Sequence, residues 1–361
     1  MLYKNIYNKL KDDIISGEIK PNAKIPTEFA LMKEYDVSRT TVRKAMNMLK
    51  DEKLISVSPR TGSRAVYNNA EAPAKAGKEE KNIYFDLVFP LPQKDLLTII
   101  KGIKEYFSDI EIKTAVHFVY DKNEDEITDM LLRKHTNGVI IYPWYDFSCA
   151  NMANKLISNS IPLVLVDKKI KGTFTSLVSS DNYGGMHNLT KYLIDNGHKQ
   201  IAYISTHISI GSSMYERLCG YIDALKQNDI KPDNKCIGIL SITRDSFGET
   251  IRKLIPPMPE RAATPHMPTA LICAVDGLVS GCSNYLLYSG YKIPDDVFLC
   301  SMDGTQDITF IQHPITTMAQ DFKKIGECAA EMLLQHHENK NDCIIKKYIP
   351  CKLIKLDSSA K

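Results

Sequence analysis

A short stretch near the N-terminus concentrates side chains that donate hydrogen bonds. In VSRTTVRKAM (residues 37–46), Arg39 and Arg43 are four residues apart, so on a helix both lie on one face. Each guanidinium can donate two parallel hydrogen bonds to guanine or to a phosphate, and the neighbouring serine and threonine hydroxyls suit phosphate or thymine. Taken alone, the stretch fits either a helix that contacts nucleic acid or a solvated basic helix face.

A second group of polar side chains follows apolar runs in the rest of the chain. Asp167 ends LVLV, Asp276 follows ALICAV, and Asp303 follows VFLCSM. In parallel α/β sheets, ligands bind outside the carboxyl ends of the strands, so these aspartates are placed to contact one. Carboxylates that accept hydroxyl hydrogen bonds, arginines that donate and aromatic rings that stack together make a sugar site. Any single aspartate at such a position is more often a helix N-cap.

Other chemistries lack the residues that they need. The chain has no G-x-x-x-x-G-K-[ST] phosphate loop, no G-x-G-x-x-G motif after a strand and no G-x-S-x-G nucleophile elbow. None of the nine cysteines is spaced as C-x-x-C, and His336 and His337 are adjacent, so they do not share a helix face as metal ligands would. The sequence therefore predicts a protein that is not an enzyme and that uses no metal and no cofactor.

Composition indicates two or three domains with an uneven charge distribution. The 361 residues are 43% hydrophobic and 25% charged, and no apolar run approaches the roughly 20 residues that span a bilayer. The N-terminus lacks the apolar core of a secretion signal, which predicts a cytoplasmic protein with reduced cysteines.

The charge is distributed unevenly along the chain. Residues 1–66 hold thirteen Lys and Arg against eight Asp and Glu, whereas the remainder has a net charge of −2. A basic head on a mildly acidic body indicates one module for a polyanion and one for another task.

The first 66 residues have the element order of a winged helix-turn-helix. Apolar residues recur at helical spacing in residues 6–15, and Thr27 and Ser38 are placed to cap the next two helices. Residues 54–66 predict two short strands joined by a turn. This basic hairpin favours DNA as the target of the preceding helix. Residues 67–81, YNNAEAPAKAGKEEK, are small and polar without apolar periodicity, and predict a linker.

Residues 82–361 alternate between strand-like and helix-like stretches. Apolar runs typical of strands occur at 83–89, 138–142, 163–166, 200–205, 270–274 and 297–302. Helical patterns intervene, for example at 96–107 and 184–197. Strands that alternate with helices form parallel sheets covered on both faces. About 280 residues of this pattern predict an α/β fold with two lobes, each built on a parallel sheet.

Residues 1–66 resemble the winged helix-turn-helix of GntR-family regulators. The segments that carry the resemblance are IPTEF (25–29), VSRTTVRKAMNML (37–49) and LISVSPRTGSRAV (54–66). Phe29 stands where the family usually has a basic residue, and Arg60 stands at the first glycine position of the wing. The resemblance implies DNA contacts from Ser38, Arg39, Thr40, Thr41, Arg43, Lys44, Arg60 and Gly62.

From about residue 82 the chain resembles the effector domain of LacI/GalR repressors, which is similar to periplasmic sugar-binding proteins. The segments that carry this resemblance include PTALICAVDGLVSG (268–281), GYKIPDDVFLCSMDG (290–304) and HPITTMAQDFKKIGECAAEMLL (313–334). Val275 stands where the family usually has asparagine, and Asp276 is expected as a helix cap or hinge residue. The resemblance implies sugar contacts from Asp167, Ser213, Arg217, Asp303, Gln320 and Phe322, with Phe89 and Asp95 closing from the first lobe.

Together, these features predict a bacterial transcriptional repressor of carbohydrate-utilisation genes. The resemblance implies a homodimer that binds a near-palindromic operator in double-stranded DNA and has no membrane partner. It also implies a sugar effector, such as the pentose L-arabinose, that closes the two lobes and releases the operator. Two alternatives come from other classes: a sugar-binding transport-type protein, and an α/β enzyme with an accessory domain. The basic head argues against the first, and the missing catalytic motifs argue against the second.

Overall fold

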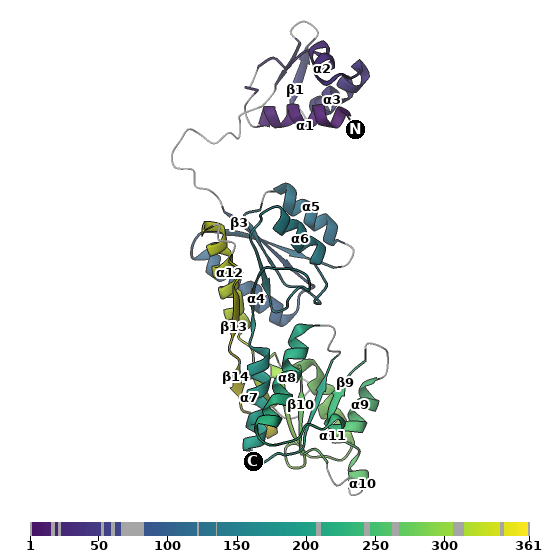
Figure 1. Ribbon diagram of the computed structural model, residues 1–361, viewed down its shortest axis with the longest axis vertical. Helices are drawn as coiled ribbons and strands as arrows, with labels where there is room; N and C mark the ends of the chain where they lie inside the picture. The colour runs from purple at the N-terminus through teal and green to yellow at the C-terminus, as the bar shows by residue number, and fades with distance from the viewer. Residues whose placement is uncertain are drawn as a thin grey trace. The chain divides into compact units, whose positions relative to one another are not determined.

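The computed structural model divides the chain into two compact units, Met1–Glu80 and Lys81–Lys361 (Figure 1). Each unit has its own hydrophobic core. The predicted linker, residues 67–81, lies outside the described part of the chain. The residues that the structure describes are 2–15, 19–20, 23–51, 54–58, 62–65, 83–120, 123–134, 136–206, 211–241, 246–261, 267–305, 314–339 and 343–359.

The smaller unit has three helices followed by an antiparallel hairpin, the order predicted for a winged helix-turn-helix. Helix α2 begins after Thr27, whose Oγ1 accepts a hydrogen bond from the Ala30 amide at 3.2 Å. The backbones of Lys24 and Arg64 form an isolated antiparallel β-bridge beside the hairpin. The elements are α1 (Leu2–Ile15), α2 (Glu28–Tyr35), α3 (Arg39–Asp51), β1 (Ile55–Ser58) and β2 (Gly62–Ala65).

Helix α3 has one buried and one exposed face. The buried face packs in the core of the smaller unit, which also contains Leu10 of α1 and Leu31 of α2. Burying an apolar side chain of this size contributes about 1.5–3 kcal/mol, so packing on one face is enough to hold the helix while its other face remains in solvent. The side chains that α3 buries are Val42, Ala45, Met46 and Leu49.

The first lobe of the larger unit is a six-stranded sheet with helices on both faces (Figure 1). Its strand order is β13-β7-β6-β5-β3-β4, and all pairings are parallel. Helices α4 and α12 pack on one face, and α5 and α6 pack on the other. The elements are β3 (Tyr84–Phe89), α4 (Lys94–Ser108), β4 (Lys113–Phe118), α5 (Glu124–Lys134), β5 (Gly138–Ile141), α6 (Ala150–Ser158), β6 (Leu163–Val166), β7 (Ser176–Ser180), α12 (Phe322–Asn339) and β13 (Lys346–Ile349).

The second lobe is built on a similar sheet, with strand order β14-β12-β11-β10-β8-β9. Only the β12–β14 pairing in it is antiparallel among the described strands. Helices α7 and α8 cover one face, and α9 and α11 cover the other. The elements are α7 (Asn182–Asp195), β8 (Ile201–Ser205), α8 (Ser212–Gln227), η2 (Asn234–Cys236), β9 (Ile237–Ile239), α9 (Ser246–Leu254), α10 (Met258–Arg261), β10 (Ala270–Cys273), η3 (Asp276–Leu278), α11 (Val279–Tyr288), β11 (Phe298–Asp303), β12 (Thr316–Ala319), β14 (Lys352–Ile354) and η5 (Asp357–Ser359).

The chain passes between the lobes three times: after β7, after β12 and after β13. The crossing segments contact one another. The Asp181 amide donates to the Ile349 carbonyl at 2.9 Å, and Cys351 Sγ donates to the Asp181 carbonyl at 3.7 Å. Both lobes are therefore assembled from segments that are distant in the sequence, and α12 and β13 near the C-terminus complete the first lobe.

The predicted fold class is confirmed. The six strands expected from apolar runs are present as β3, β5, β6, β8, β10 and β11, and the two expected helices are present as α4 and α7. Six further strands, β4, β7, β9, β12, β13 and β14, were not expected from the sequence. They complete both sheets, and their apolar runs are short or interrupted by polar residues.

Two glycines bring α4 and α12 into close contact. A Cβ added at Gly102 would lie 2.3 Å from the carbonyl oxygen of Lys323, and one at Gly326 would lie 2.2 Å from the carbonyl oxygen of Ile99. Both distances are far shorter than any van der Waals contact, and close-packed interiors do not yield by that much. Glycine is therefore required at both positions for the two helices to pack as they do.

Candidate functional site

Arg39 and Arg43, the two arginines of α3, converge on one carboxylate. Arg39 Nε donates to Glu28 Oε2 at 2.8 Å, and Arg43 Nε donates to Glu28 Oε1 at 3.2 Å. The arginine side chains are 65% and 61% exposed. The hydrogen bond from Arg39 lowers the pKa of Glu28, and Arg43 adds to this effect against the opposing effect of burial. These pairs use the Nε atoms, so the terminal guanidinium nitrogens can still reach a base edge or a phosphate.

The hydroxyls at the start of α3 form a connected group. Ser38 Oγ lies 2.7 Å from Thr40 Oγ1 and 2.9 Å from Thr41 Oγ1, and it accepts a hydrogen bond from the Thr41 amide at 3.4 Å. Ser38 thus caps the helix, as its position in the sequence predicted. The free amides and the positive dipole end of a helix N-terminus also favour a phosphate, so this group suits contact with a nucleic-acid backbone.

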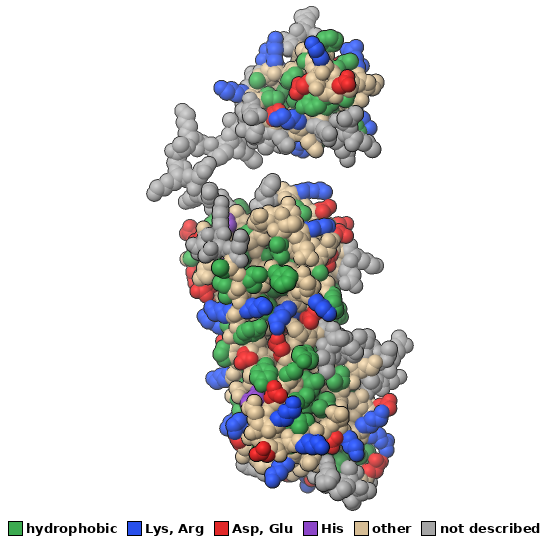
Figure 2. Space-filling view, in the orientation of Figure 1, with side chains coloured by type: hydrophobic (Ala, Val, Ile, Leu, Met, Phe, Trp, Pro, Cys, Tyr) green, Lys and Arg blue, Asp and Glu red, His purple; other side chains and the backbone are tan. Residues whose placement is uncertain are grey.

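The remaining residues predicted to contact DNA are placed differently. Lys44 Nζ lies 4.4 Å from the centre of the Tyr3 ring, so its ammonium is held against α1 rather than beside the arginines. Gly62 begins β2 with a φ of 82°, a conformation that glycine adopts without strain. Arg60 lies outside the described residues. On the face shown in the space-filling view, Lys and Arg side chains of the smaller unit are scattered and do not form one patch (Figure 2).

A cavity of about 250 Å³ lies between the two lobes of the larger unit. It is found at the carboxyl ends of strands from both sheets, where ligands bind in α/β folds. Of the eight residues predicted for a sugar site, the structure brings seven together here, with Phe89 as the exception. The lining residues are Gln93, Asp95, Tyr142, Asp167, Lys168, Thr206, Gly211, Ser213, Met214, Arg217, Val275, Asp303, Gln320 and Phe322.

The structure corrects the expected role of Phe89. Its side chain is fully buried in the core of the first lobe, with its ring centre 5.9 Å from that of Tyr142. Tyr142, which directly follows β5, lines the cavity instead. Phe89 ends β3, and the alternation of side chains along a strand turns it into the core. It supports the cavity wall from behind.

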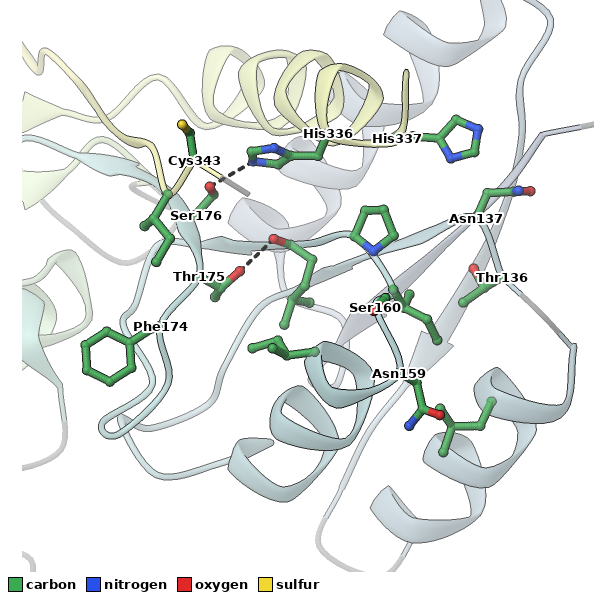
Figure 3. Close-up of a pocket in the computed structure, with 16 residues that line it drawn as sticks. Thr136, Asn137, Asn159, Ser160, Phe174, Thr175, Ser176, His336, His337 and Cys343 are labelled. Atoms are coloured by element: carbon green, nitrogen blue, oxygen red, sulfur yellow. Dashed lines mark hydrogen bonds between the residues drawn. The ribbon is translucent and has the colours of Figure 1, made fainter. Parts of the chain in front are cut away.

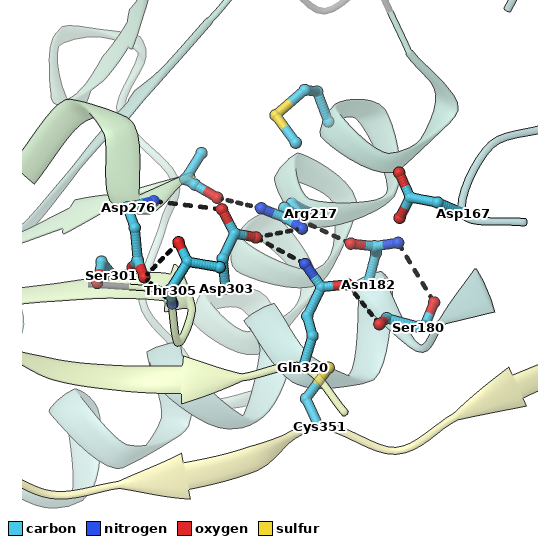
Figure 4. Close-up of polar contacts among 12 residues, drawn as sticks. Asp167, Ser180, Asn182, Arg217, Asp276, Ser301, Asp303, Thr305, Gln320 and Cys351 are labelled. Atoms are coloured by element: carbon cyan, nitrogen blue, oxygen red, sulfur yellow. Dashed lines mark hydrogen bonds and ion pairs between the residues drawn. The ribbon is translucent and has the colours of Figure 1, made fainter. Parts of the chain in front are cut away.

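Arg217 of α8 is the centre of a buried polar network (Figure 4). Its Nε donates to Asn182 Oδ1 at 2.8 Å, and its Nη1 donates to the Ala274 carbonyl at 2.5 Å. Its Nη2 lies 2.8 Å from Asp303 Oδ1, and the arginine side chain is only 3% exposed. Burial opposes the charge of Arg217, but the carboxylates of Asp303 and Asp167 outweigh it and raise the pKa of the guanidinium. The arginine is therefore a fixed, charged donor on the cavity wall.

Asp303 ends β11 and receives several hydrogen bonds. Gln320 Nε2 donates to Asp303 Oδ1 at 2.7 Å, and the Asp276 amide donates to Asp303 Oδ2 at 3.3 Å. Gln320 Oε1 in turn accepts a hydrogen bond from Ser180 Oγ (Figure 4). Burial raises the pKa of Asp303 to about 6, and the nearby Arg217 offsets this only in part. The carboxylate thus connects the cavity to two of the segments that cross between the lobes.

Asp276 lies behind the cavity rather than in its lining. Its carboxylate accepts hydrogen bonds from Ser301 Oγ and from the Thr305 amide, each at 2.6 Å (Figure 4). It therefore ties the end of β10 to β11 and the segment that follows it. Burial raises the pKa of Asp276 despite these hydrogen bonds. The expected helix-cap role is not found, since Val275 is the N-cap residue of η3 and no side chain caps that helix; Asp276 has a supporting position instead.

On the opposite wall, Asp167 follows β6 and is held by two neighbours. Tyr142 OH donates to Asp167 Oδ2 at 2.6 Å, and Lys168 Nζ donates to the same oxygen at 3.0 Å. Burial works against the charge of Asp167, but Lys168 and Tyr142 outweigh it and lower the pKa of the carboxyl. Lys168 Nζ also lies 4.4 Å from the centre of the Tyr142 ring. Tyr142 and Lys168 were not among the residues predicted from the sequence.

Asp167 and Asp303 both adopt positive φ angles, of 68° and 135°. Such backbone conformations cost a residue other than glycine about 1–3 kcal/mol, and they persist where the surrounding structure imposes them. Both aspartates stand at the carboxyl end of a strand and line the same cavity. Strained backbone at two facing carboxylates is typical of a site that is organised before its ligand arrives.

A second cavity, of about 860 Å³, lies in the first lobe beside the starts of β5, β6 and β7 (Figure 3). Polar side chains at one end of it are paired with protein groups: Ser176 Oγ lies 2.8 Å from His336 Nε2, and Thr175 Oγ1 donates to the Leu163 carbonyl at 2.7 Å. None of the predicted site residues lines this cavity. The smaller cavity, with its buried charged network, is therefore the candidate site.

The described residues bear on three features of the sequence: membrane spans, metal ligands and cysteines. No helix among them is long and apolar enough to cross a membrane. They contain no group of three or more His, Cys, Asp or Glu side chains that could hold a metal ion. Each of the nine cysteines is a free thiol.

Comparison with known proteins relates both units to gene regulators. Residues 2–64 match the model of bacterial regulatory proteins of the gntR family, and residues 190–359 match that of the periplasmic binding protein-like domain. The chain is 25% identical over 336 residues to the arabinose metabolism transcriptional repressor of Halalkalibacterium halodurans, covering 90% of this chain and 88% of that protein. It is 26% identical over 355 residues to the protein of the same name from Geobacillus stearothermophilus, covering 93% and 92%.

A solved structure shows the same fold. The transcriptional regulator CelR-cellobiose complex superimposes with a TM-score of 0.65 at 19% identity, covering 90% of this chain and 92% of that chain. The names of these similar proteins describe them as transcriptional repressors or regulators. The two resemblances expected from the sequence are therefore confirmed. The chain thus joins a domain that matches the gntR family of bacterial regulatory proteins to one that matches the periplasmic binding protein-like domain.

Proposed function

We propose that this regulator is a repressor that binds operator DNA through α3 and releases it when a sugar binds between the two lobes of the larger unit. The observation that carries the proposal is the cavity itself. Its buried Arg217–Asp303 pair on one wall faces the Asp167–Tyr142 pair on the other, and both walls belong to a fold that is joined to a DNA-binding unit.

In the smaller unit, Arg39 and Arg43 read base edges while the hydroxyls of Ser38, Thr40 and Thr41 contact phosphates. The exposed guanidiniums support this division, since each can make a bidentate contact with guanine. The hydroxyl group at the start of α3 supports the second part, because backbone contacts of this kind fix the register of a helix on DNA.

The effector is a small neutral sugar, and L-arabinose is the first to test. Both cations that line the cavity, Arg217 and Lys168, are already paired with carboxylates, so the site does not favour an additional anion. Sugar hydroxyls both donate and accept, which suits the alternating donors and acceptors of these pairs. Phe322 supplies an apolar surface for the C–H edges of the ring. Two relatives that match most of the chain are named arabinose metabolism repressors.

A sugar that contacts both lobes stabilises their closed arrangement. It weakens DNA binding only to the extent that it binds better to the DNA-free state than to the DNA-bound state. Gln320 is suited to transmit the change, because it links Asp303 in the cavity to Ser180 on another segment that crosses between the lobes.

The regulator acts in the cytoplasm as a homodimer, with residues 82–361 as the effector-binding and dimerisation unit and a near-palindromic operator as its target. The surface for the second copy is the β4 edge of the first sheet. This edge strand has no neighbour on its outer side among the described strands. Large apolar side chains are exposed along it and on the adjoining elements, at Leu91, Leu97, Phe118 and Tyr120.

The DNA-binding part of the proposal is tested by R39A and R43A. Each substitution removes a bidentate contact and should weaken binding to DNA from upstream of the protein's own gene by about 1–3 kcal/mol. Fluorescence anisotropy at fixed, moderate salt measures this affinity. Unchanged operator affinity in the double variant would exclude α3 as the recognition helix.

The sugar-binding part is tested by R217A and D303A in the same assay. Both variants should bind the DNA like the wild type, since neither residue belongs to the DNA-binding unit. Wild-type protein should be released as L-arabinose is added, whereas the variants should stay bound. Normal release of either variant would show that the cavity is not the effector site.

A further inference from the structure

We propose that Asp146 and Lys169 of the first lobe form a latch on the first two turns of α8, and that this latch sets how readily the lobes close on a sugar. The inference rests on the proposed function of the cavity and extends it to the regulation of that site. It is carried by two contacts between the lobes, both outside the cavity lining.

The first contact supplies a helix cap from the other lobe. Helix α8 begins after Gly211, which has no side chain to satisfy the free amides of the first turn. Asp146, in the loop between β5 and α6, fills this role. Its Oδ1 accepts a hydrogen bond from the Ser212 amide at 3.0 Å and lies 3.5 Å from Ser212 Oγ. A carboxylate at a helix N-terminus also interacts favourably with the helix dipole.

The second contact is an ion pair one turn further along α8. Lys169 Nζ, in the loop after β6, lies 2.7 Å from Glu216 Oε1. The pair is part-buried, with side chains that are 41% and 25% exposed. Glu216 directly precedes Arg217, so this ion pair joins α8 to the first lobe next to the buried arginine of the cavity.

The two first-lobe loops that carry the latch are joined to each other. The Lys171 amide donates to the Asp146 carbonyl at 2.7 Å, which links the loop after β5 to the loop after β6. Within the first loop, the Tyr145 amide donates to Ser148 Oγ at 2.9 Å and fixes the turn that presents Asp146. The latch residues therefore move as one surface with the first lobe.

These two contacts affect the cavity because Ser213 and Arg217 of α8 line it. Both contacts require the lobes to be close together, since each joins a first-lobe loop to a second-lobe helix. Separation of the lobes would break both contacts and leave the start of α8 without its cap. The latch thus favours the closed arrangement before any sugar is present, and so reduces the free energy that the sugar must supply.

The cap is tested by D146A and D146N in the full-length protein without sugar. Hydrogen–deuterium exchange in peptides spanning residues 211–217 should become faster in D146A, because the cap is lost. It should stay near the wild-type rate in D146N, because asparagine caps a helix about as well as aspartate. D125A is the matched control, since Asp125 contacts Asn151 and Lys155 inside the first lobe. Equal exchange in D146A, D125A and the wild type would overturn the cap.

The ion pair is tested by K169E, E216K and the double variant, with L-arabinose as the probe and the single tryptophan, Trp144, as the fluorescent reporter. Each single reversal should raise the sugar concentration at half-saturation about three- to tenfold, and the double exchange should restore it toward the wild-type value. K253E, which breaks the Glu249 pair within α9, should leave the midpoint unchanged. Identical midpoints in all variants would overturn the coupling between the latch and the site.

The two measurements test the latch and the identity of the effector independently of each other. If L-arabinose does not bind the wild type, the proposed effector is wrong. The exchange measurement then still decides the latch, because it uses no sugar. In that case, faster exchange of α8 in K169E and E216K, with recovery in the double variant, would support the latch, and unchanged exchange in all three would overturn it.

Discussion

Asp303 keeps a pKa of about 6 although Arg217 lies 2.8 Å away. Burial disfavours the charged carboxylate more than one arginine compensates, and the nearby Asp276 adds like charge. Because the folded-state pKa lies above the ordinary value of 3.8, the folded protein holds a proton that the unfolded chain releases. The stability contributed by this proton is fully present below about pH 4 and is lost as the pH rises through about 6.

The D303N variant isolates this effect. Between pH 4 and pH 7, the unfolding free energy of the wild type should fall relative to that of D303N, by on the order of 3 kcal/mol. Denaturant unfolding of the full-length protein, followed through Trp144, measures the difference at each pH. Parallel pH profiles for the two proteins would contradict the raised pKa of Asp303.

On the proposed DNA-binding surface, Glu28 fixes the Nε atoms of both α3 arginines. We expect E28Q to bind random-sequence DNA more tightly, since a negative charge next to the phosphates is removed. Its preference for operator over random DNA should shrink about three- to tenfold, because the arginines are no longer fixed. E34Q, on the same helix, is the control. An unchanged preference in E28Q would show that the arginines do not depend on Glu28.

The sequence predicted the arginine and the aspartates of the cavity better than their neighbours. Arg217 and Asp303 could be identified because one belongs to a segment with a family resemblance and the other stands at a strand end. Tyr142 and Lys168 could not, because their roles depend on contacts with Asp167 that only the folded lobe creates. Glu28 was likewise hidden, since an acidic residue in the first turn of a helix is common for reasons unrelated to DNA.

Among the elements, the apolar central strands were predictable and the polar strands were not. Strand β7, SLVSS, is fully buried although three of its five residues are serines. Its Ser179 Oγ donates to the Asp167 carbonyl at 2.8 Å, so tertiary hydrogen bonds compensate for the polarity of the strand. Strand β13, KKYI, lies at the edge of its sheet, where lysines are typical and an apolar run is not needed.

The packing of α4 on α12 gives a prediction at the same scale. G326A should destabilise the larger unit by about 1–3 kcal/mol or more, because the new methyl group would force the helices apart. G248A is a matched control in α9, where a Cβ meets no atom within 4 Å and alanine should be neutral or stabilising. Denaturant unfolding followed through Trp144 compares the two. Equal stability of G326A and the wild type would contradict the close helix contact.

For the molecule as a whole, the proposed homodimer can be tested at the β4 edge. L97D places a charge on an exposed apolar position of α4, so it should weaken self-association at least about tenfold without unfolding the chain. Sedimentation equilibrium of the full-length protein measures the dissociation constant. F174D changes a side chain that is 83% exposed in the loop before β7 and serves as the control. Equal association of L97D and F174D would place the interface elsewhere.

The three passages between the lobes have a consequence for synthesis on the ribosome. The first lobe begins with β3, but its sheet lacks an edge strand until β13 is made, and α4 alone covers one face of its core until α12 is made. Apolar side chains from residue 85 onwards must therefore wait for about 240 further residues before they are enclosed. The second lobe, whose residues from α7 to β12 are contiguous, can assemble most of its sheet earlier. A nascent chain can thus form most of its second sheet before the first lobe is enclosed, and the two sheets are completed only as β13 and β14 emerge.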